Sequence, residues 1–157
     1  MTLQPTAEGD LLIEEIPAFL LELLREIPVR AASKHPGVEE RFLPDPANDD
    51  GIREDWKALV QPELMALFQS DRETVQADLR GVAAKKMGAA LRIPKNHSDA
   101  WMGALNQARL AIAEEGGFGE ADMAAEVAPD PGDPRGMALF QVGFYGFLQE
   151  CLVRMQD

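Results

Sequence analysis

Four polar residues in two segments of this sequence form a candidate ligand-binding site. Asn106 and Arg109 are three residues apart on an expected helix, at the flank of its apolar stripe, so they share a helix face. The stem of an arginine in such a position is partly buried, and its guanidinium needs acceptors. Asp49 and Asp50, at the start of another expected helix, can supply them. We favour a structural ion pair between two helices over a clamp for a ligand carboxylate, because polar groups at helix flanks usually satisfy one another.

The sequence contains few residues that could bind a metal ion or carry out redox chemistry. The sequence has two histidines, His35 and His97, and neither has a second metal-type ligand at helical spacing. We interpret both as exposed loop residues. The only cysteine, Cys151, lies in a helical apolar pattern and is interpreted as a small buried hydrophobe. We therefore expect no metal and no cofactor.

Residues 45–51 match a calcium-binding loop only in part. When Gly51 is placed at the sixth position, Asn48 and Asp50 fall at the third and fifth positions. Pro46 and Lys57 then occupy the first and twelfth positions, where carboxylates are needed. We interpret the acidic residues of this loop as helix-capping groups. Without a nucleophile, a base or a metal set, the sequence favours a protein that is not an enzyme.

Composition excludes several classes of protein. The chain has 157 residues, 46% of them hydrophobic and 27% charged, which is typical of a globular domain. Its 27 acidic and 15 basic residues give a net charge of -12, so most of its surface would repel a phosphate backbone. No apolar run is long enough to span a bilayer, and no signal peptide is recognisable at the N-terminus. We expect a cytoplasmic protein that binds neither nucleic acid nor membrane.

The apolar periodicity predicts a mainly α protein of five to six helices. Residues 1–9 are interpreted as a flexible N-terminus, and residues 10–157 as a single helical domain. Ser98 is expected to cap the most regular helix, and Ser70 to Glu73 has the spacing of a capping box. Pairing of two short strands, residues 11–16 and 90–94, would add one two-stranded β ribbon. The expected helices are 17–27, 52–68 with a break or kink at Pro62, 70 to about 82, 98–116, 120–127 and 135–155.

The C-terminal helix carries apolar residues on more than one face. The expected main face holds Met137, Phe140, Phe144, Phe147, Leu148, Cys151 and Met155. Val142, Tyr145 and Val153 lie elsewhere on the helix, which predicts a central helix or an interface with a second copy of the chain. Gly136 and Gly143 are seven residues apart at the edge of the main face, where we expect a neighbouring helix to approach closely.

Two segments are similar to a known bacterial family. The first is Phe42-Leu43-Pro44-Asp45, followed by Asp49-Asp50 and the helix from Ile52. The second is the run from Asp99 to Leu110, which contains Trp101, Ala104-Leu105-Asn106 and Arg109-Leu110. Both resemble the domain-of-unknown-function family numbered two thousand and seventeen, over roughly residues 10–118. The resemblance implies a mainly helical intracellular protein, found widely in actinobacteria, with no assigned reaction and a role in regulation suggested for some members.

Two classes of function are compatible with these observations. The first is a non-catalytic regulatory or protein-binding module with an unknown protein partner, because the sequence supplies helical surfaces and acidic charge but no catalytic set. The alternative is an enzyme or small-ligand binder that uses Asp50, Asn106 and Arg109. An open pocket at this cluster would favour the alternative, and a cluster closed by side chains would favour the first class.

Overall fold

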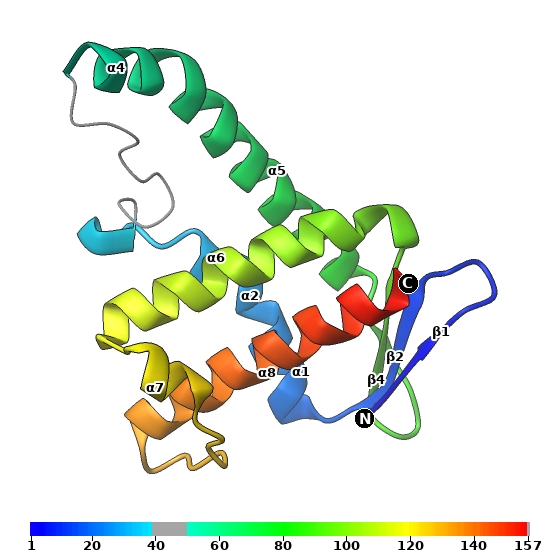
Figure 1. The fold of residues 1–157 in the computed structure, drawn as a ribbon. Helices are drawn as coiled ribbons and strands as arrows, with labels where there is room; N and C mark the ends of the chain where they lie inside the picture. The colour runs from blue at the N-terminus through cyan, green and yellow to red at the C-terminus, as the bar shows by residue number, and fades with distance from the viewer. Residues whose placement is uncertain (39–49, 157) are drawn as a thin grey trace.

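The computed structural model describes residues 1–38 and 50–156 and shows a mainly helical protein with a small antiparallel sheet at one end (Figure 1). The predicted mainly α fold is confirmed. None of the helices in these two ranges is long and apolar enough to cross a membrane. The helical elements are α1 (Ala18–Arg25), α2 (Ile27–Ala31), α4 (Asp50–Asp55), the π-helical turn η1 (Trp56–Val60), α5 (Gln61–Arg80), the 3-10 turn η2 (Lys95–His97), α6 (Ser98–Gly116), α7 (Glu120–Ala124) and α8 (Pro134–Met155).

The sheet contains the predicted ribbon and extends it on both sides. Strands β2 (Leu11–Ile16) and β4 (Ala89–Ile93) pair antiparallel, with Leu11 opposite Ile93 and Ile13 opposite Leu91. Strands β1 (Thr2–Pro5) and β3 (Ala83–Ala84) complete the order β1-β2-β4-β3. The sequence pattern predicts no strand within residues 1–9. Strand β1 has no buried residue, so it carries little of the apolar pattern by which strands are recognised.

A bulge in β2 sets which side chains face the core. Glu15 adopts a φ of 54°, and the register between β2 and β4 shifts between Ile13 and Ile16. Ile13 and Ile16 are therefore both buried, although three residues apart they would point to opposite faces of a regular strand. Gly88 accommodates the bulge, because a Cβ there would lie 2.7 Å from the carbonyl oxygen of Ile16.

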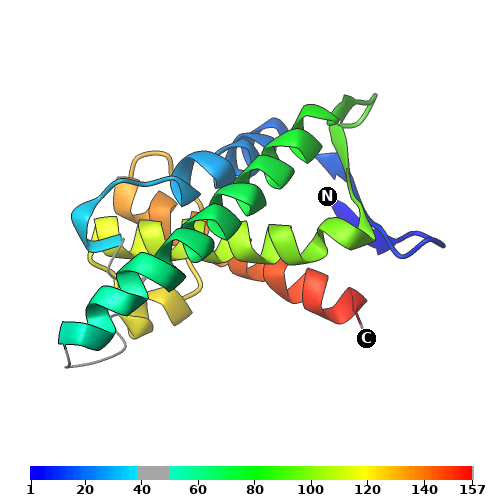
Figure 2. The same ribbon diagram turned by 90° about the horizontal axis from the view of Figure 1, so that it is seen from above.

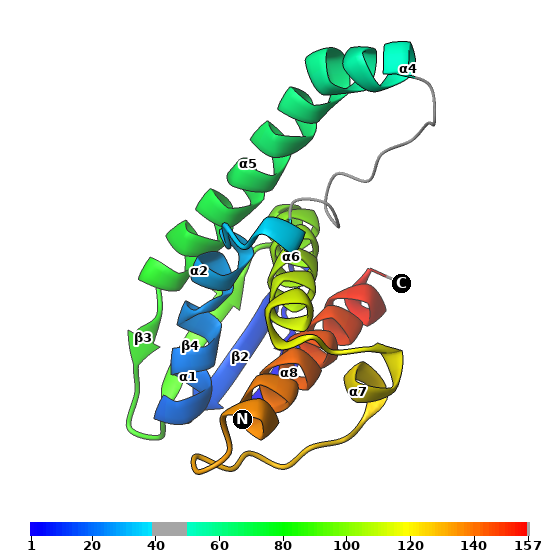
Figure 3. The ribbon, with the colours of Figure 1, turned by 90° about the vertical axis from the view of Figure 1, so that its left-hand side faces the viewer.

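Helix α6 is the centre of the helical part of the molecule. It packs against α2, α5 and α8 (Figures 1 and 3), and Trp101, Ala104, Leu105 and Ala108 on it are fully buried. The alanines allow the neighbouring helices to approach closely. From the sequence, the C-terminal helix is expected either in this central position or at an interface with a second copy of the chain. In the structure, α8 packs on one side of α6 (Figure 1) and leaves part of its own surface exposed.

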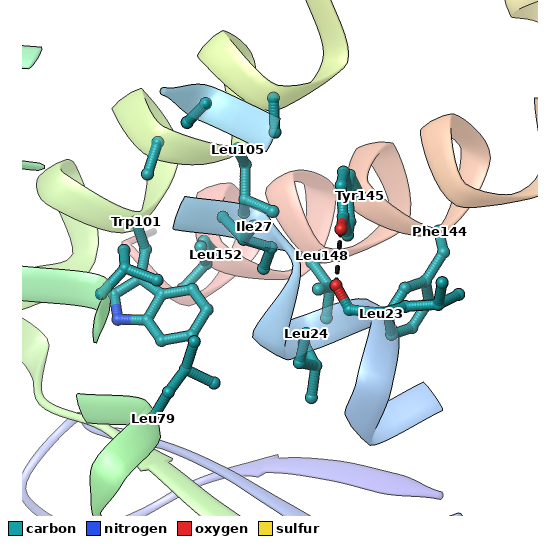
Figure 4. Close-up of a cluster of buried hydrophobic side chains, with 14 of the residues drawn as sticks. Leu23, Leu24, Ile27, Leu79, Trp101, Leu105, Phe144, Tyr145, Leu148 and Leu152 are labelled. Atoms are coloured by element: carbon teal, nitrogen blue, oxygen red, sulfur yellow. Dashed lines mark hydrogen bonds between the residues drawn. The ribbon is translucent and has the colours of Figure 1, made fainter. Parts of the chain in front are cut away.

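Helix α8 buries a face that is rotated from the predicted one. Phe144 and Leu148 of the predicted face are buried, and Tyr145 and Leu152 are buried with them (Figure 4). Phe147, which also belongs to the predicted face, is 45% exposed. Tyr145 fixes this orientation, because its hydroxyl donates a hydrogen bond to the carbonyl oxygen of Leu23 on α1 and accepts one from Gln141. Burial raises the pKa of this hydroxyl. With one bond donated and one accepted, the buried hydroxyl of Tyr145 is not left unpaired.

Elements α4, η1 and α5 form one continuous helical arm, residues 50–80, whose C-terminal end packs against α6 and whose N-terminal part projects away from the body of the molecule (Figures 1 and 2). The predicted break or kink at Pro62 takes the form of a π-helical turn, at which the helix axis bends (Figures 1 and 3). Pro62 has no N–H for the usual bond, and the N–H of Gln61 bonds to the carbonyl oxygen of Trp56. The prediction of a separate helix beginning at Ser70 is wrong, because α5 runs through this exposed residue without interruption.

Two phenylalanines of α8 test the observed orientation of the helix. Phe144 is 7% exposed and belongs to the core, so Phe144→Ala should lower the free energy of unfolding by about 3–5 kcal/mol. Phe147→Ala, at an exposed position three residues later, should lower it by less than about 1 kcal/mol. Urea unfolding of both variants measures the difference. Equal losses would contradict the rotation of α8 described here.

Candidate functional site

The structure does not bring Asp50, Asn106 and Arg109 of the predicted site together. Asp49 lies outside the described residues. The Asp50 side chain is 97% exposed at the tip of the projecting arm, and its carboxylate lies 3.9 Å from Arg53. Asn106 is exposed on α6 and makes no hydrogen bond with Arg109. The expected contact between Asp50 and Arg109 is therefore wrong.

The direction of Arg109 explains this outcome. Gln107 is buried and accepts a hydrogen bond from Arg72 of α5, at 3.2 Å, so this side of α6 faces the arm. Residues two apart on a helix point in nearly opposite directions. Arg109 accordingly turns toward α8, where its Nη1 donates a hydrogen bond of 2.8 Å to Oε1 of Gln149. Gln149 is itself oriented by a bond from Nε2 to the carbonyl oxygen of Met102 at 3.4 Å.

The guanidinium of Arg109 lies close against the backbone of α8. A Cβ at Gly146 would come within 3.2 Å of Cζ and 3.3 Å of Nη2. From the sequence, a neighbouring helix is expected to approach α8 closely at Gly136 and Gly143. Gly143 instead has no neighbour within 4 Å of a Cβ position, and at Gly136 a Cβ would meet Asp133 at 2.5 Å. Gly146 is the glycine of α8 at which a neighbouring helix places a side chain.

Arg109 has no carboxylate partner among the residues that the structure describes. Its Nε is buried and has no hydrogen-bond partner, and burial lowers the pKa of the guanidinium. Five other arginines have an acidic side chain within 3.4 Å, namely Arg25, Arg30, Arg92, Arg135 and Arg154. A partly desolvated cation without a counter-charge is energetically unfavourable, and it is the feature of this region that packing alone does not explain.

Arg109 lines a groove formed by α6, α7, the segment after α7 and α8. We call this the Arg109 groove; one part has a volume of about 430 Å³, and an adjoining part on the α7 side about 360 Å³. Both parts share Arg109, Met123 and Ala124. The walls of the larger part are mostly apolar, and its one acidic residue, Glu126, is exposed. The apolar wall residues are Met123, Val127, Leu139, Phe140, Phe144 and Phe147.

A second polar cluster, formed by Asp78, His97 and Trp101, joins the end of α5 to the start of α6. The Asp78 carboxylate lies 2.8 Å from Nδ1 of His97 and accepts a hydrogen bond of 2.8 Å from the indole Nε1 of Trp101. The interpretation of His97 as an exposed loop residue is wrong, because its side chain is partly buried in this cluster. The side chain of Ser98 does not cap α6 and instead accepts a hydrogen bond from Gln156. Sequence spacing could not reveal this cluster, since Asp78 lies 23 residues from Trp101.

Within residues 1–38 and 50–156, no group of three or more His, Cys, Asp or Glu side chains is arranged to hold a metal ion. Most of the calcium-like loop, residues 45–49, lies outside these ranges. Cys151 is half-buried on α8, and burial raises the pKa of its thiol, which keeps it protonated and weakly nucleophilic.

These features define a mainly helical protein with a small antiparallel sheet, an apolar groove containing an arginine, and a projecting arm. The chain belongs to the family described as a domain of unknown function, DUF2017, whose family model matches residues 5–156. The resemblance seen over residues 10–118 thus extends through α8. No curated protein and no solved structure matches the chain significantly.

The Asp78 cluster generates a prediction about stability. Asp78→Ala removes the acceptor of a fully buried indole N–H and should lower the free energy of unfolding by about 1–3 kcal/mol. Glu73→Ala is the matched control on the same helix, because Glu73 is exposed and accepts only from exposed Gln69. The control should change the free energy by less than about 0.5 kcal/mol, as followed by urea unfolding. If the two variants lose the same amount, the cluster does not secure α5 to α6.

Proposed function

We propose that this protein is a non-catalytic, regulatory or protein-binding module that contacts a protein partner through the projecting arm. The observation that carries this proposal is the lack of burial along the arm. From Asp50 onward, the first buried side chain is that of Val75. The four large apolar residues that are more than half exposed on this stretch are Ile52, Leu59, Met65 and Leu67.

A helix of this kind gains little from the rest of the chain. Most of the stability of helices in proteins comes from packing of an apolar face, and single exposed apolar residues scattered over a surface carry no special meaning. Here they gather on one continuous element that projects from the body (Figure 3). Burying one such side chain against a partner contributes about 1.5–3 kcal/mol. Contact with a partner would therefore bury the apolar side chains of the arm that stay more than half exposed in the described part of the chain.

The base of the arm adds a hollow to this surface. A cavity of about 290 Å³ lies between α5 and the segment after α2, and its lining is mostly apolar. Met65 and Arg72 contribute from the arm, and Ala32, Pro36 and Val38 from the facing segment. An apolar side chain of a partner fits such a hollow beside an exposed helix.

The charge of the arm indicates the chemistry of the partner. Residues 50–74 contain six acidic and three basic side chains, so the apolar positions are set in a net negative surface. A partner with an apolar groove and a basic rim complements this surface, whereas a phosphate backbone does not. The arm thus favours a protein partner over a nucleic acid.

Substitution on the arm tests the proposal. The variant with Leu59→Glu and Leu67→Glu should lose the partner that the unaltered chain captures from an extract of its source cells, because both apolar contacts become charged. Val29→Glu, at a residue 70% exposed on α2, is the matched control and should retain the partner. Neither variant should shift the thermal midpoint by more than about 2 °C, because all three positions are exposed.

Two results would contradict the proposal. One is capture of the same protein by the unaltered chain and by the arm variant, and the other is capture of no protein by either. Sedimentation of the purified chain examines the second-copy partner that the sequence predicts for α8. A dimer that persists in the arm variant but is lost when Val153, exposed on α8, is replaced by Glu would assign the interface to α8.

A further inference from the structure

We propose that the Arg109 groove is a binding site for an aliphatic monocarboxylic acid, with the carboxylate on Arg109 and the acyl chain along the apolar wall of α8. This site is separate from the arm. Arg109 supplies the cation, and the wall supplies the apolar surface, including Phe140 and Phe147. The size of the groove, about 430 Å³ in its larger part, is in the range of small-molecule sites.

Most N–H donors of the Arg109 guanidinium have no hydrogen-bond partner in the described chain. Of its five N–H donors, the described chain pairs one, the Nη1 that bonds to Gln149. A carboxylate accepts two parallel N–H bonds from a guanidinium, and it brings the negative charge that the surroundings of Arg109 lack. In a chain with 27 acidic residues, the absence of a carboxylate at this half-buried cation leaves the position open for one from a ligand.

Arg109 is also held in a fixed position. Gln149 holds Nη1, and the bare backbone at Gly146 leaves room for the guanidinium against α8. Little side-chain freedom therefore remains to be lost when a ligand binds. Gly146 has a packing role, since a Cβ there would lie 3.2 Å from Cζ of Arg109, closer than an ordinary van der Waals contact.

The residues of the groove restrict the form of the ligand. Glu126 is exposed at the groove and disfavours a dianion such as a phosphate monoester, which would also need more donors than one arginine provides. The apolar wall offers few side-chain hydrogen bonds for the amides of a peptide. Gly143 leaves open space along this wall, with nothing within 4 Å of a Cβ position. A single charge with an unbranched apolar chain matches all three features.

Titration calorimetry with decanoate, below the concentration at which it forms micelles, tests the site. We expect one molecule of decanoate to bind per chain. Decanol, which keeps the chain without the charge, and acetate, which keeps the charge without the chain, should each bind at least about tenfold more weakly. The Nε–H signal of Arg109 in ¹H–¹⁵N spectra should shift on addition of decanoate and remain unchanged with decanol.

Three variants separate the site from general adsorption. Arg109→Met keeps an apolar stem and should weaken decanoate at least about tenfold, whereas Arg154→Met, at an exposed arginine of α8, should leave it unchanged. Gly143→Leu fills the groove and should also weaken binding about tenfold. The same change should raise the thermal midpoint by roughly 2–4 °C, because leucine is a better helix former at this exposed position. Loss of binding in Gly143→Leu thus cannot come from unfolding.

Three outcomes would overturn the proposal. Equal affinity of Arg109→Met and the unaltered chain for decanoate would show adsorption to apolar surface alone. No binding of decanoate by either Glu126→Gln or the unaltered chain would show that Arg109 recruits no carboxylate, even with its acidic neighbour neutralised. Arginine-dependent binding of an apolar peptide with a free C-terminal carboxylate, without binding of decanoate, would assign the groove to a peptide.

Discussion

The burial of the Trp101 indole is the constraint on which the arrangement of the helices depends. Trp101 is fully buried at the first turns of α6, and its N–H needs an acceptor that water cannot provide. Asp78 supplies this acceptor from the last turn of α5, and its carboxylate also pairs with Nδ1 of His97. The polar atoms of both rings are thereby satisfied next to the apolar core. The position of α5 against α6 is therefore fixed at one end by a hydrogen-bonded carboxylate (Figure 4 shows Trp101 beside Leu79).

The arm is a consequence of this one-ended attachment. Val75 and Leu79 are the buried side chains of α5, and both lie close to the Asp78 cluster in sequence. Toward its N-terminus, α5 has the hydrogen bond from Arg72 to Gln107 as a further link to α6, and beyond it the helix exposes apolar side chains. Beyond the π-helical turn at Pro62 the helix axis bends, and α4 continues outward at an angle to α5 without folding back onto the body (Figures 1 and 3).

Local patterns predicted the elements better than their partners. Strands 11–16 and 90–94 carry buried residues and are recognisable, and helix 98–116 ends at a glycine with a φ of 65°, as its sequence indicates. The rotation of α8 was predicted wrongly because it depends on one hydroxyl, that of Tyr145, bonding to Leu23 some 122 residues earlier. Of the candidate site, Arg109 takes its acceptor, Gln149, from α8 and not from the start of α4. The direction in which the Arg109 side chain points could not be predicted, because the sequence does not show which helix packs on which side of α6.

Gly143 and Gly146, three residues apart on α8, show how this helix combines two roles. Glycine inside a helix is unfavourable by about 1 kcal/mol relative to alanine, so each position needs a reason in the structure. At Gly146 the reason is visible, since the guanidinium of Arg109 packs against the helix with Cζ 3.2 Å from the place of a Cβ. At Gly143, one turn away, the described part of the chain has no atom within 4 Å of that place. Packing thus accounts for the first glycine, while the second leaves open space along the apolar wall of the Arg109 groove.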